Sequence, residues 1–198
     1  MSSIPHEICL LDQFPIQLDW NEHLLFLFDI DGVVCNTNMH YTDESKLSVD
    51  EYKKLMQERV CSPLFIKTAH VLLQFQHDFG TKFEIKFLTG RKPFVKQETE
   101  KMFQDAGLDA FINDIIYYPE ELAWATEEYL EFKVMTVANF YIQYDHIYYI
   151  DDNERLIQTM TENLRHLPRI HIFFYYGNGD GCIKKTKKTD SHAKKIRP

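Results

Sequence analysis

Five apolar runs of strand length recur along the chain, and stretches with helical periodicity separate them. The runs lie at residues 24–28, 83–88, 112–117, 147–150 and 170–176. Strands that alternate with helices are typical of a parallel sheet with helices packed on both faces. The pattern therefore predicts an α/β fold, a Rossmann-like doubly wound parallel sheet of about five strands.

The helical segments that follow the runs lie at residues 63–79, 92–106, 120–141 and 154–164. In residues 92–106, apolar positions such as Phe94 and Met102 leave a polar opposite face, and Gly107 provides a C-terminal stop. This segment is predicted to be a crossover helix between two parallel strands. Residues 47–58, between the first and second strands, also have a helical pattern.

Composition limits the class of protein. A chain of 198 residues and 23.6 kDa suffices for one domain, and a hydrophobic fraction of 44% predicts a folded core rather than disorder. No apolar run approaches the roughly 20 residues of a membrane span. Residues 1–11 carry neither basic residues nor a long apolar stretch, so no secretory signal is visible and a cytoplasmic protein is expected. The four cysteines are widely spaced and are expected to be free thiols.

The charge is distributed unevenly. Of 22 basic and 30 acidic residues, seven basic and one acidic residue lie in residues 184–198, which leaves 15 basic against 29 acidic residues in positions 1–183. The sequence thus predicts an acidic domain over residues 1–183 and a basic, flexible tail over residues 184–198. A basic tail is compatible with a nucleic-acid partner, but blocks of like charge also serve as solvated ends.

Polar residues follow three of the predicted strands at the point where each strand ends. They are Asp29-Ile30-Asp31-Gly32, Thr89-Gly90-Arg91 and Asp151-Asp152-Asn153. Doubly wound sheets bind ligands beyond the carboxyl ends of their strands, so these groups are expected to meet at one rim.

The carboxylates in this set favour a metal site. Asp29 and Asp31 stand two positions apart, which directs both side chains to the same side of an extended segment, and Asp151 and Asp152 end a neighbouring strand. Clustered carboxylates stay ionised beside a cation, and an all-oxygen set suits Mg²⁺. The alternative for the first pair is a turn in which the Asp side chains accept hydrogen bonds from backbone N–H groups.

Written out, residues 24–37 (LLFLFDIDGVVCNT) resemble the first motif of the haloacid dehalogenase (HAD) superfamily of phosphohydrolases. FLTGR at residues 87–91 resembles the second motif, and YYIDDN at residues 148–153 resembles the acidic fourth motif. Lys133, 18 residues before Asp151, is placed like the lysine of the third motif. The four signatures follow the family's order.

The resemblance implies a mechanism. Asp29 would be the nucleophile that forms an aspartyl phosphate, and Asp31 would be the general acid and base, a role that needs a proton near neutral pH. Mg²⁺ would be held by Asp29, by the backbone carbonyl of Asp31 and by Asp151, with Asp152 as a direct or supporting ligand. Thr89 and Lys133 would bind the phosphoryl oxygens, because phosphoryl transfer depends on positioning and positive charge.

Several assignments have alternatives. Lys133 can instead lie on a solvated helix face beside acidic residues, with Lys92 and Lys96 as its substitutes in the site. Thr89 can be an ordinary strand-end residue that bonds its own backbone. Gly90 and Arg91 are grouped with Thr89 as substrate-binding residues; Arg91 would grip a second phosphate or a carboxylate, or else form a surface ion pair.

The spacing of the motifs bears on the substrate. The 58 positions from Asp31 to Thr89 leave room for a small cap at most, and none is expected between Arg91 and Lys133. An open site resembles family members that act on large substrates, such as the phosphatase domain of polynucleotide kinase. The expected function is a Mg²⁺-dependent phosphomonoester hydrolase without a membrane partner and of open oligomeric state. The alternatives are a small-molecule or nucleotide phosphatase and a non-catalytic HAD-like binding module.

Overall fold

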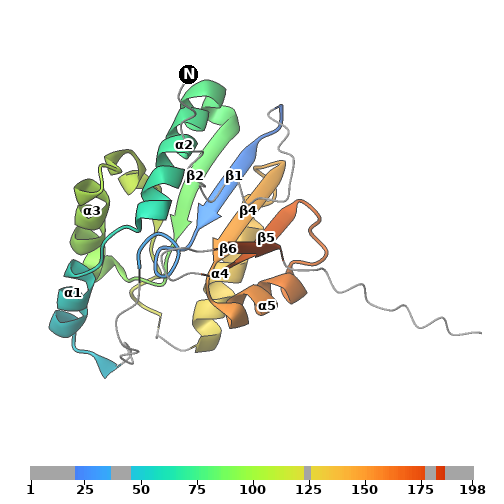
Figure 1. Ribbon diagram of the computed structural model, residues 1–198. Helices are drawn as coiled ribbons and strands as arrows, with labels where there is room; N and C mark the ends of the chain where they lie inside the picture. The colour runs from blue at the N-terminus through green and yellow to red at the C-terminus, as the bar shows by residue number, and fades with distance from the viewer. Residues whose placement is uncertain (1–20, 37–45, 123–125, 177–181, 186–198) are drawn as a thin grey trace, which may run out of the picture.

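A six-stranded sheet forms the centre of the protein. The computed structural model describes residues 21–36, 46–122, 126–176 and 182–185 (Figure 1). The strands follow the order β3-β2-β1-β4-β5-β6, with the bounds β1 Leu24–Phe28, β2 Phe83–Leu88, β3 Ile115–Ile116, β4 His146–Asp151, β5 Ile170–Tyr176 and β6 Cys182–Lys185. The first five strands are parallel, and β6 is antiparallel to β5. The prediction of a Rossmann-like doubly wound sheet is confirmed.

Five α-helices connect the strands: α1 Val49–Gln57, α2 Pro63–Phe79, α3 Lys96–Asp105, α4 Thr126–Phe140 and α5 Glu154–Asn163. Three of them begin at a side-chain cap, because Ser48, Ser62 and Asn153 each accept a hydrogen bond from a backbone N–H of the first turn. Short 3₁₀ helices are η3 Gly80–Lys82, η4 Pro93–Val95 and η5 Asp109–Asp114. Among the helices of the described ranges, none has the length and apolar character required to cross a bilayer.

The sheet is buried on both faces (Figure 1). Side chains of β1 alternate between two cores: Leu24, Phe26 and Phe28 pack with α2 and α3, whereas Leu25 and Leu27 pack with α4 and α5. All five are at most 1% exposed. This explains why β1 reads as a continuous apolar run instead of an alternating one, as is usual for a central parallel strand.

Aromatic packing fixes the carboxyl end of β1. The ring of Phe28 lies 5.5 Å from that of Phe65 in α2 and 6.1 Å from that of Phe87 in β2, measured between centroids. Phe87 in turn contacts Phe103 of α3 at 5.0 Å. Because such rings fill the core at close-packed density, the backbone that leaves β1 toward Asp29 starts from a rigid position.

The direction of winding reverses between β1 and β4. The chain proceeds outward from β1 through β2 to β3, and then returns to the other side of β1 as β4. Asp29 lies at this switch point, and its backbone N–H donates to the carbonyl oxygen of Ile150 at 2.9 Å. Ligand sites of open α/β sheets form in the crevice at such a reversal.

Four elements differ from the expectations. The helix expected over residues 120–141 spans Thr126–Phe140 as α4. The third strand was expected over residues 112–117 but spans only Ile115–Ile116, because the preceding residues form η5. The helix expected over residues 92–106 is divided into η4 and α3. Strand β6 was not predicted: it includes Lys184 and Lys185, which composition had assigned to the tail, and its polar sequence pairs with β5 through the backbone. Residues 186–198 lie outside the described residues.

The connection between β1 and α2 contains α1, which lies beside α3 (Figure 1). Tyr52 and Met56 of α1 form a small core with Val95, and the Tyr52 ring contacts that of Phe94 at 5.8 Å. Residues 37–45 of the expected small cap lie outside the described residues. Between Arg91 and Lys133, residues 91–122 and 126–133 form only the elements of the sheet and its helices, as predicted.

Candidate functional site

Three carboxylates meet at the switch point. Asp29 follows β1, Asp151 ends β4 and Asp152 comes next in the chain. One oxygen from each lies within 4.8 Å of the others. Asp29 is 5% exposed and Asp151 is fully buried. The predicted adjacency of the first, second and fourth strands is confirmed, and it brings these acidic side chains together.

Lys133 projects from α4 into this acidic cluster. Its Nζ donates to Asp29 Oδ1 at 2.6 Å and to Asp151 Oδ2 at 2.8 Å. The side chain is fully buried, so the alternative of a solvated helix face is wrong. The substitutes lie elsewhere: Lys96 pairs with Glu100 at the surface, and the Nζ of Lys92 donates to backbone carbonyls of residues 120 and 122.

Neighbouring groups hold Asp151 in one orientation. The Tyr149 hydroxyl donates to Oδ2, the oxygen that also binds Lys133. The backbone N–H of Asn153 donates to Oδ1 at 2.8 Å. Tyr149 was not singled out from the sequence, although its position two residues before Asp151 in a strand places both side chains on the same side of the sheet.

The electrostatics of the cluster favour an added cation. Burial raises the pKa of Asp29 well above its usual range; the Lys133 ammonium opposes this shift, and the carboxylates of Asp151, Asp152 and Asp31 add to it. The pKa of Lys133 lies above its usual range, because its two carboxylate partners outweigh its burial. A bound cation would favour the ionised forms of these carboxyls. With all three ionised, the cluster and the Lys133 ammonium would carry a net charge of minus two, which one divalent ion would balance.

The donor set fits magnesium. All three groups that meet in the cluster offer carboxylate oxygens, the ligands that Mg²⁺ prefers. Within the part of the chain that the structure describes, no imidazole or thiolate that would favour zinc joins them. Mg²⁺ typically uses one or two carboxylates and completes its shell with water or phosphate oxygens. Asp29, Asp151 and Asp152 are therefore a suitable set, which the sequence had indicated.

Gly32 makes room for Asp152. Its φ is +87°, and a Cβ at this position would lie 1.9 Å from Asp152 Oδ2. Only glycine adopts this positive φ without strain and also leaves the space of a Cβ free for Asp152. Burial, reinforced by the charge of Asp151, raises the pKa of Asp152 to about 7. The turn after β1 thus lets a carboxylate from β4 approach the backbone closely.

Gly90 has a similar role on the opposite side of the site. A Cβ there would lie 2.9 Å from Cε2 of Tyr129, whose ring faces the Lys133 ammonium at 5.2 Å. Tyr129 precedes Lys133 by one helical turn, so both lie on the same face of α4. Gly90 thereby permits the close approach of the helix that carries Lys133. Its expected contact with substrate stays a prediction.

Thr89 satisfies the backbone in this structure. Its hydroxyl accepts a hydrogen bond from the N–H of Arg91 at 3.1 Å, and the residue is fully buried. This arrangement is the strand-end alternative considered above. Binding of phosphoryl oxygens by Thr89 stays a prediction.

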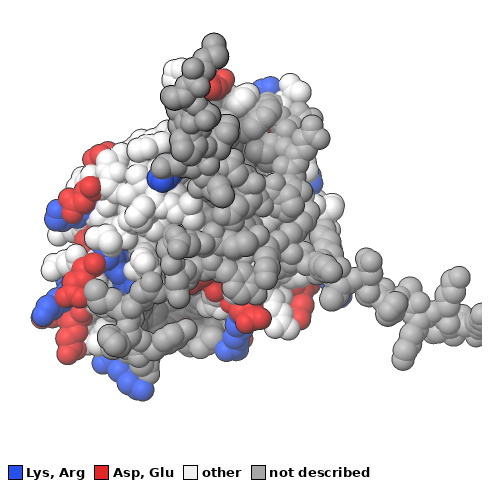
Figure 2. Space-filling model, in the orientation of Figure 1, with Lys and Arg blue, Asp and Glu red and all other residues white. Residues whose placement is uncertain are grey.

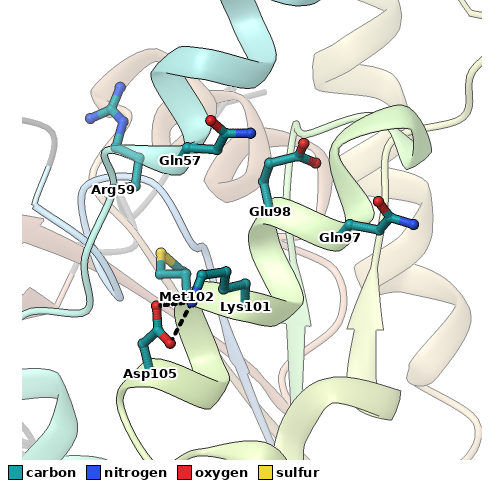
Figure 3. Close-up of a pocket in the computed structure, with 7 residues that line it drawn as sticks. All are labelled: Gln57, Arg59, Gln97, Glu98, Lys101, Met102 and Asp105. Carbon is teal, nitrogen blue, oxygen red and sulfur yellow. Dashed lines mark hydrogen bonds and ion pairs between the residues drawn. The ribbon is translucent and has the colours of Figure 1, made fainter.

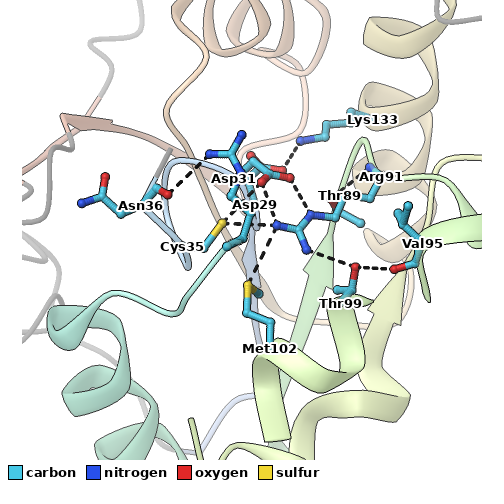
Figure 4. Close-up of polar contacts among 11 residues, drawn as sticks. Asp29, Asp31, Cys35, Asn36, Thr89, Arg91, Val95, Thr99, Met102 and Lys133 are labelled. Atoms are coloured by element: carbon cyan, nitrogen blue, oxygen red, sulfur yellow. Dashed lines mark hydrogen bonds and ion pairs between the residues drawn. The ribbon is translucent and has the colours of Figure 1, made fainter. Parts of the chain in front are cut away.

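Arg91 turns inward and binds Asp31 (Figure 4). Its Nε donates to Oδ2 and one terminal nitrogen to Oδ1, both at 2.8 Å, which is the bidentate geometry of a strong Arg–carboxylate pair. The other terminal nitrogen donates to Thr99 Oγ1 of α3 at 3.1 Å. Since the Arg91 side chain is fully buried, this geometry does not support the expected grip on a substrate. The ion-pair alternative fits better, although the arginine is in the interior.

The pairing sets the charge of Asp31. Burial by itself would raise the pKa of this carboxyl, but the charge and hydrogen bonds of Arg91 outweigh it and lower the pKa to about 2. Asp31 is therefore ionised at neutral pH. The expected proton near neutral pH does not fit this arrangement, in which Asp31 is 30% exposed and anionic.

A pocket of about 380 Å³ lies between α1 and α3 (Figure 3). Arg59, Glu98 and Met102 contribute to its lining. Met102 separates it from the site, because its sulfur also contacts Arg91 at 3.9 Å. None of the three clustered carboxylates lines the pocket.

The comparisons with known proteins leave the family open. No protein-family model matches the chain, and a search of curated proteins finds no relative. The resemblance to the HAD superfamily accordingly stays a prediction from the quoted motifs.

We predict that Gly90→Ala destabilises the protein by about 1–3 kcal/mol, because the new methyl group overlaps the Tyr129 ring. The φ of Gly90 is not positive, so backbone strain does not contribute. Urea unfolding measures the change. In the double variant with Tyr129→Ala the overlap disappears. The losses of unfolding free energy in the two single variants should therefore sum to more than the loss in the double variant. Strict additivity would contradict this explanation.

We predict that Asp31→Asn destabilises the fold by roughly 3 kcal/mol at neutral pH, because a buried guanidinium loses its counter-ion. The pKa of Asp31 is about 2 when the protein is folded, against 3.8 for an unperturbed aspartate, so its stabilisation is complete above pH 4 and is lost as the pH falls toward 2. Urea unfolding of both proteins at pH 7, 4 and 2.5 should show a shrinking difference. A difference in unfolding free energy that stays constant with pH would contradict the assignment of this stabilisation to ionised Asp31.

Proposed function

We propose that the protein is a Mg²⁺-dependent phosphohydrolase of the HAD type, which cleaves phosphomonoesters through an aspartyl phosphate on Asp29. The observation that carries the proposal is the position of the Asp29 carboxylate. It lies at the switch point of the sheet, bound to the buried ammonium of Lys133 and beside two further carboxylates. The motifs at residues 24–37, 87–91 and 148–153 support the same interpretation.

Asp29, Asp151 and Asp152 would hold the metal. Bound Mg²⁺ would neutralise charge on the phosphoryl oxygens and on the carboxylates around them. The protein supplies the orientation: Tyr149 and the N–H of Asn153 fix Asp151, while Gly32 admits Asp152. Asp31 would add its backbone carbonyl, as the family resemblance implies.

The chemistry proposed for Asp29 has two displacements. In the first, a carboxylate oxygen attacks phosphorus and the bond from phosphorus to the ester oxygen breaks. The leaving oxygen takes a proton from Asp31, which gains that proton from water in the substrate-bound state, and departs as the alcohol. In the second, water attacks phosphorus, the bond to Asp29 breaks, and phosphate is released. Lys133 holds the attacking carboxylate in place and contributes positive charge as charge develops on the transferred group.

We infer that proton exchange at Asp31 belongs to the substrate-bound state. In the free protein the Arg91 pair keeps this carboxyl ionised. A phosphate dianion bound beside Asp31 would add negative charge and raise its pKa, which favours uptake of a proton from water in the second displacement. Arg91 then acts as a positioning residue that aims Asp31, and its two parallel hydrogen bonds fix the plane of the carboxylate.

The proposed substrate class is a phosphomonoester, with a polynucleotide end or another large substrate as the preferred form and a nucleotide or small molecule as the alternative. Figure 2 shows acidic and basic side chains interspersed along the edge formed by α1 and α3. Attraction of a polyanion would thus depend on the basic residues 184–198, most of which lie outside the described residues. The cytoplasmic location also stays a prediction.

The test of the function is hydrolysis of an aryl phosphate with and without Mg²⁺. Turnover should require the metal and fall by at least roughly 10³-fold in Asp29→Asn, because the amide is not a nucleophile. Asp109→Asn, an exposed position before β3, is the matched control and should keep full activity. Turnover that persists in Asp29→Asn after chelation of metal would contradict the proposal.

Arg91→Lys tests the positioning role. Lysine keeps the charge but cannot donate two parallel hydrogen bonds to Asp31, so kcat should fall roughly 10- to 100-fold while KM changes little. Arg165→Lys at an exposed position is the control. Steady-state kinetics separate the two parameters, and a rise in KM at constant kcat would assign Arg91 to substrate binding instead.

A further inference from the structure

Two cysteines face each other beside the site. Cys35, in the turn after β1, and Cys61, before α2, are directly opposite in an isolated antiparallel bridge. The hydrogen bond next to them runs from the Ser62 N–H to the Val34 carbonyl at 2.8 Å, and the N–H of Cys35 donates to Ile30. The cysteines therefore occupy a non-hydrogen-bonded position of the bridge.

This position suits a disulfide. Residues paired in this way have Cα atoms about 4.5 Å apart and side chains on the same side. Disulfides connect Cα atoms separated by about 4.4–6.8 Å, so the bond can form by rotation of two side chains. Both cysteines are free thiols in the structure, and both are buried. We propose that Cys35 and Cys61 form a redox-active pair that closes to a disulfide under oxidising conditions.

The reaction needs a low-molecular-weight disulfide such as oxidised glutathione. The thiolate of Cys61, the more exposed residue at 7% against 1% for Cys35, attacks one sulfur, and the small disulfide breaks to release one thiol. Cys35 then attacks the Cys61 sulfur of the mixed disulfide and releases the second thiol. The two protein thiols lose two electrons and two protons, and the small disulfide is reduced to two thiols.

The environment of the thiols makes this exchange slow. Burial raises the pKa of Cys61 to about 11 and that of Cys35 well above its usual value, so thiolate is scarce at neutral pH. The pair is therefore suited to sustained oxidation and not to a rapid signal. Experiments need mildly alkaline buffer and hours of equilibration.

Closure of the bond would alter the ion pair at the site. In the reduced protein the Cys35 thiol donates to Asp31 Oδ1 at 3.3 Å, and its sulfur accepts a hydrogen bond from Arg91 at 3.3 Å (Figure 4). The Cys61 thiol instead faces the carbonyl of Met102 at 3.7 Å. A disulfide removes the thiol proton and turns the Cys35 sulfur toward Cys61, so that Asp31 loses a donor. The loop from residue 35 to residue 61, with α1 inside it, becomes covalently closed.

Peptide mapping tests the bond directly. The reduced full-length protein is equilibrated at pH 8.5 in glutathione buffers of increasing oxidised fraction, then acid-quenched, alkylated and digested after glutamate. Each cysteine then lies in a separate peptide, at residues 8–22, 23–44, 59–84 and 163–198. The cross-link between 23–44 and 59–84 should increase at least roughly tenfold from the most reducing to the most oxidising buffer. Its absence in every buffer, or a preference for another pair, would overturn the proposal.

Two variants check the assignment. Cys61→Ser should abolish this cross-link, whereas Cys182→Ser should leave it intact. Oxidation should also raise the Tm of the wild-type protein and of Cys182→Ser, because a closed loop restricts the unfolded chain, and should leave the Tm of Cys61→Ser unchanged. The wild-type map decides the proposal even where a variant folds poorly.

The effect on turnover rests on the proposed function. Oxidised protein should hydrolyse an aryl phosphate roughly two- to tenfold more slowly than reduced protein, in line with the loss of one hydrogen bond to Asp31, and Cys61→Ser should be insensitive to oxidation. Unchanged turnover in protein that carries the mapped bond would overturn the coupling to the site. If the reduced protein has no Mg²⁺-dependent activity, the proposed function fails, and the peptide map still decides the disulfide.

Discussion

The candidate site depends on one buried ammonium. Lys133 binds Asp29, which follows β1, and Asp151, which ends β4, and its own helix lies on one face of the sheet. Without that charge, two carboxylates in contact with the apolar core would repel each other, and burial would favour their neutral forms. The surrounding features serve this contact: Gly90 admits the helix, Tyr129 lies against the ammonium, and Tyr149 orients the carboxylate that receives it. With all three carboxylates ionised, the net negative charge that remains would favour the divalent cation proposed for the cluster.

Much of the fold could be predicted because its signals are local. Apolar runs marked β1, β2, β4 and β5 to within one residue, and helical periodicity located α2 and α5 to within one residue. Parallel pairing then placed Asp29 and Asp151 at one edge without further information. The misjudged elements are those that local pattern does not determine. Ile112 belongs to a 3₁₀ helix although the residues around it have the apolar pattern of a strand. Strand β6 pairs with β5 through the backbone, and its apolar part, Cys182 and Ile183, is too short to predict a strand.

The site was only partly predictable, because the sequence indicates which residues have suitable chemistry but not which side chains they contact. The acidic residues followed from their positions at strand ends, and Lys133 followed from the resemblance to the HAD motifs. The direction of Arg91 did not follow from the sequence, because an arginine after a strand can face solvent or the interior. Thr99 and Met102, eight and eleven residues later, bind its side chain in the interior. The charge state of Asp31 depends on the direction of Arg91: the carboxyl expected to carry a proton is instead an anion in an ion pair. Tyr129 and Tyr149 had positional signals, one helical turn before Lys133 and two strand residues before Asp151, which become informative only once those residues are assigned.

The two aspartates that follow β1 are supported from opposite sides of the sheet. Asp29 is held by Lys133, whose helix packs in the core of α4 and α5, and Asp31 is held by Arg91, which rests on Thr99 and Met102 of α3 in the other core. The short segment between strand and turn consequently connects two hydrophobic layers that lie on opposite faces of the sheet. Because the site draws on both layers, a partly folded chain with a single layer in place would have only half of the charge arrangement.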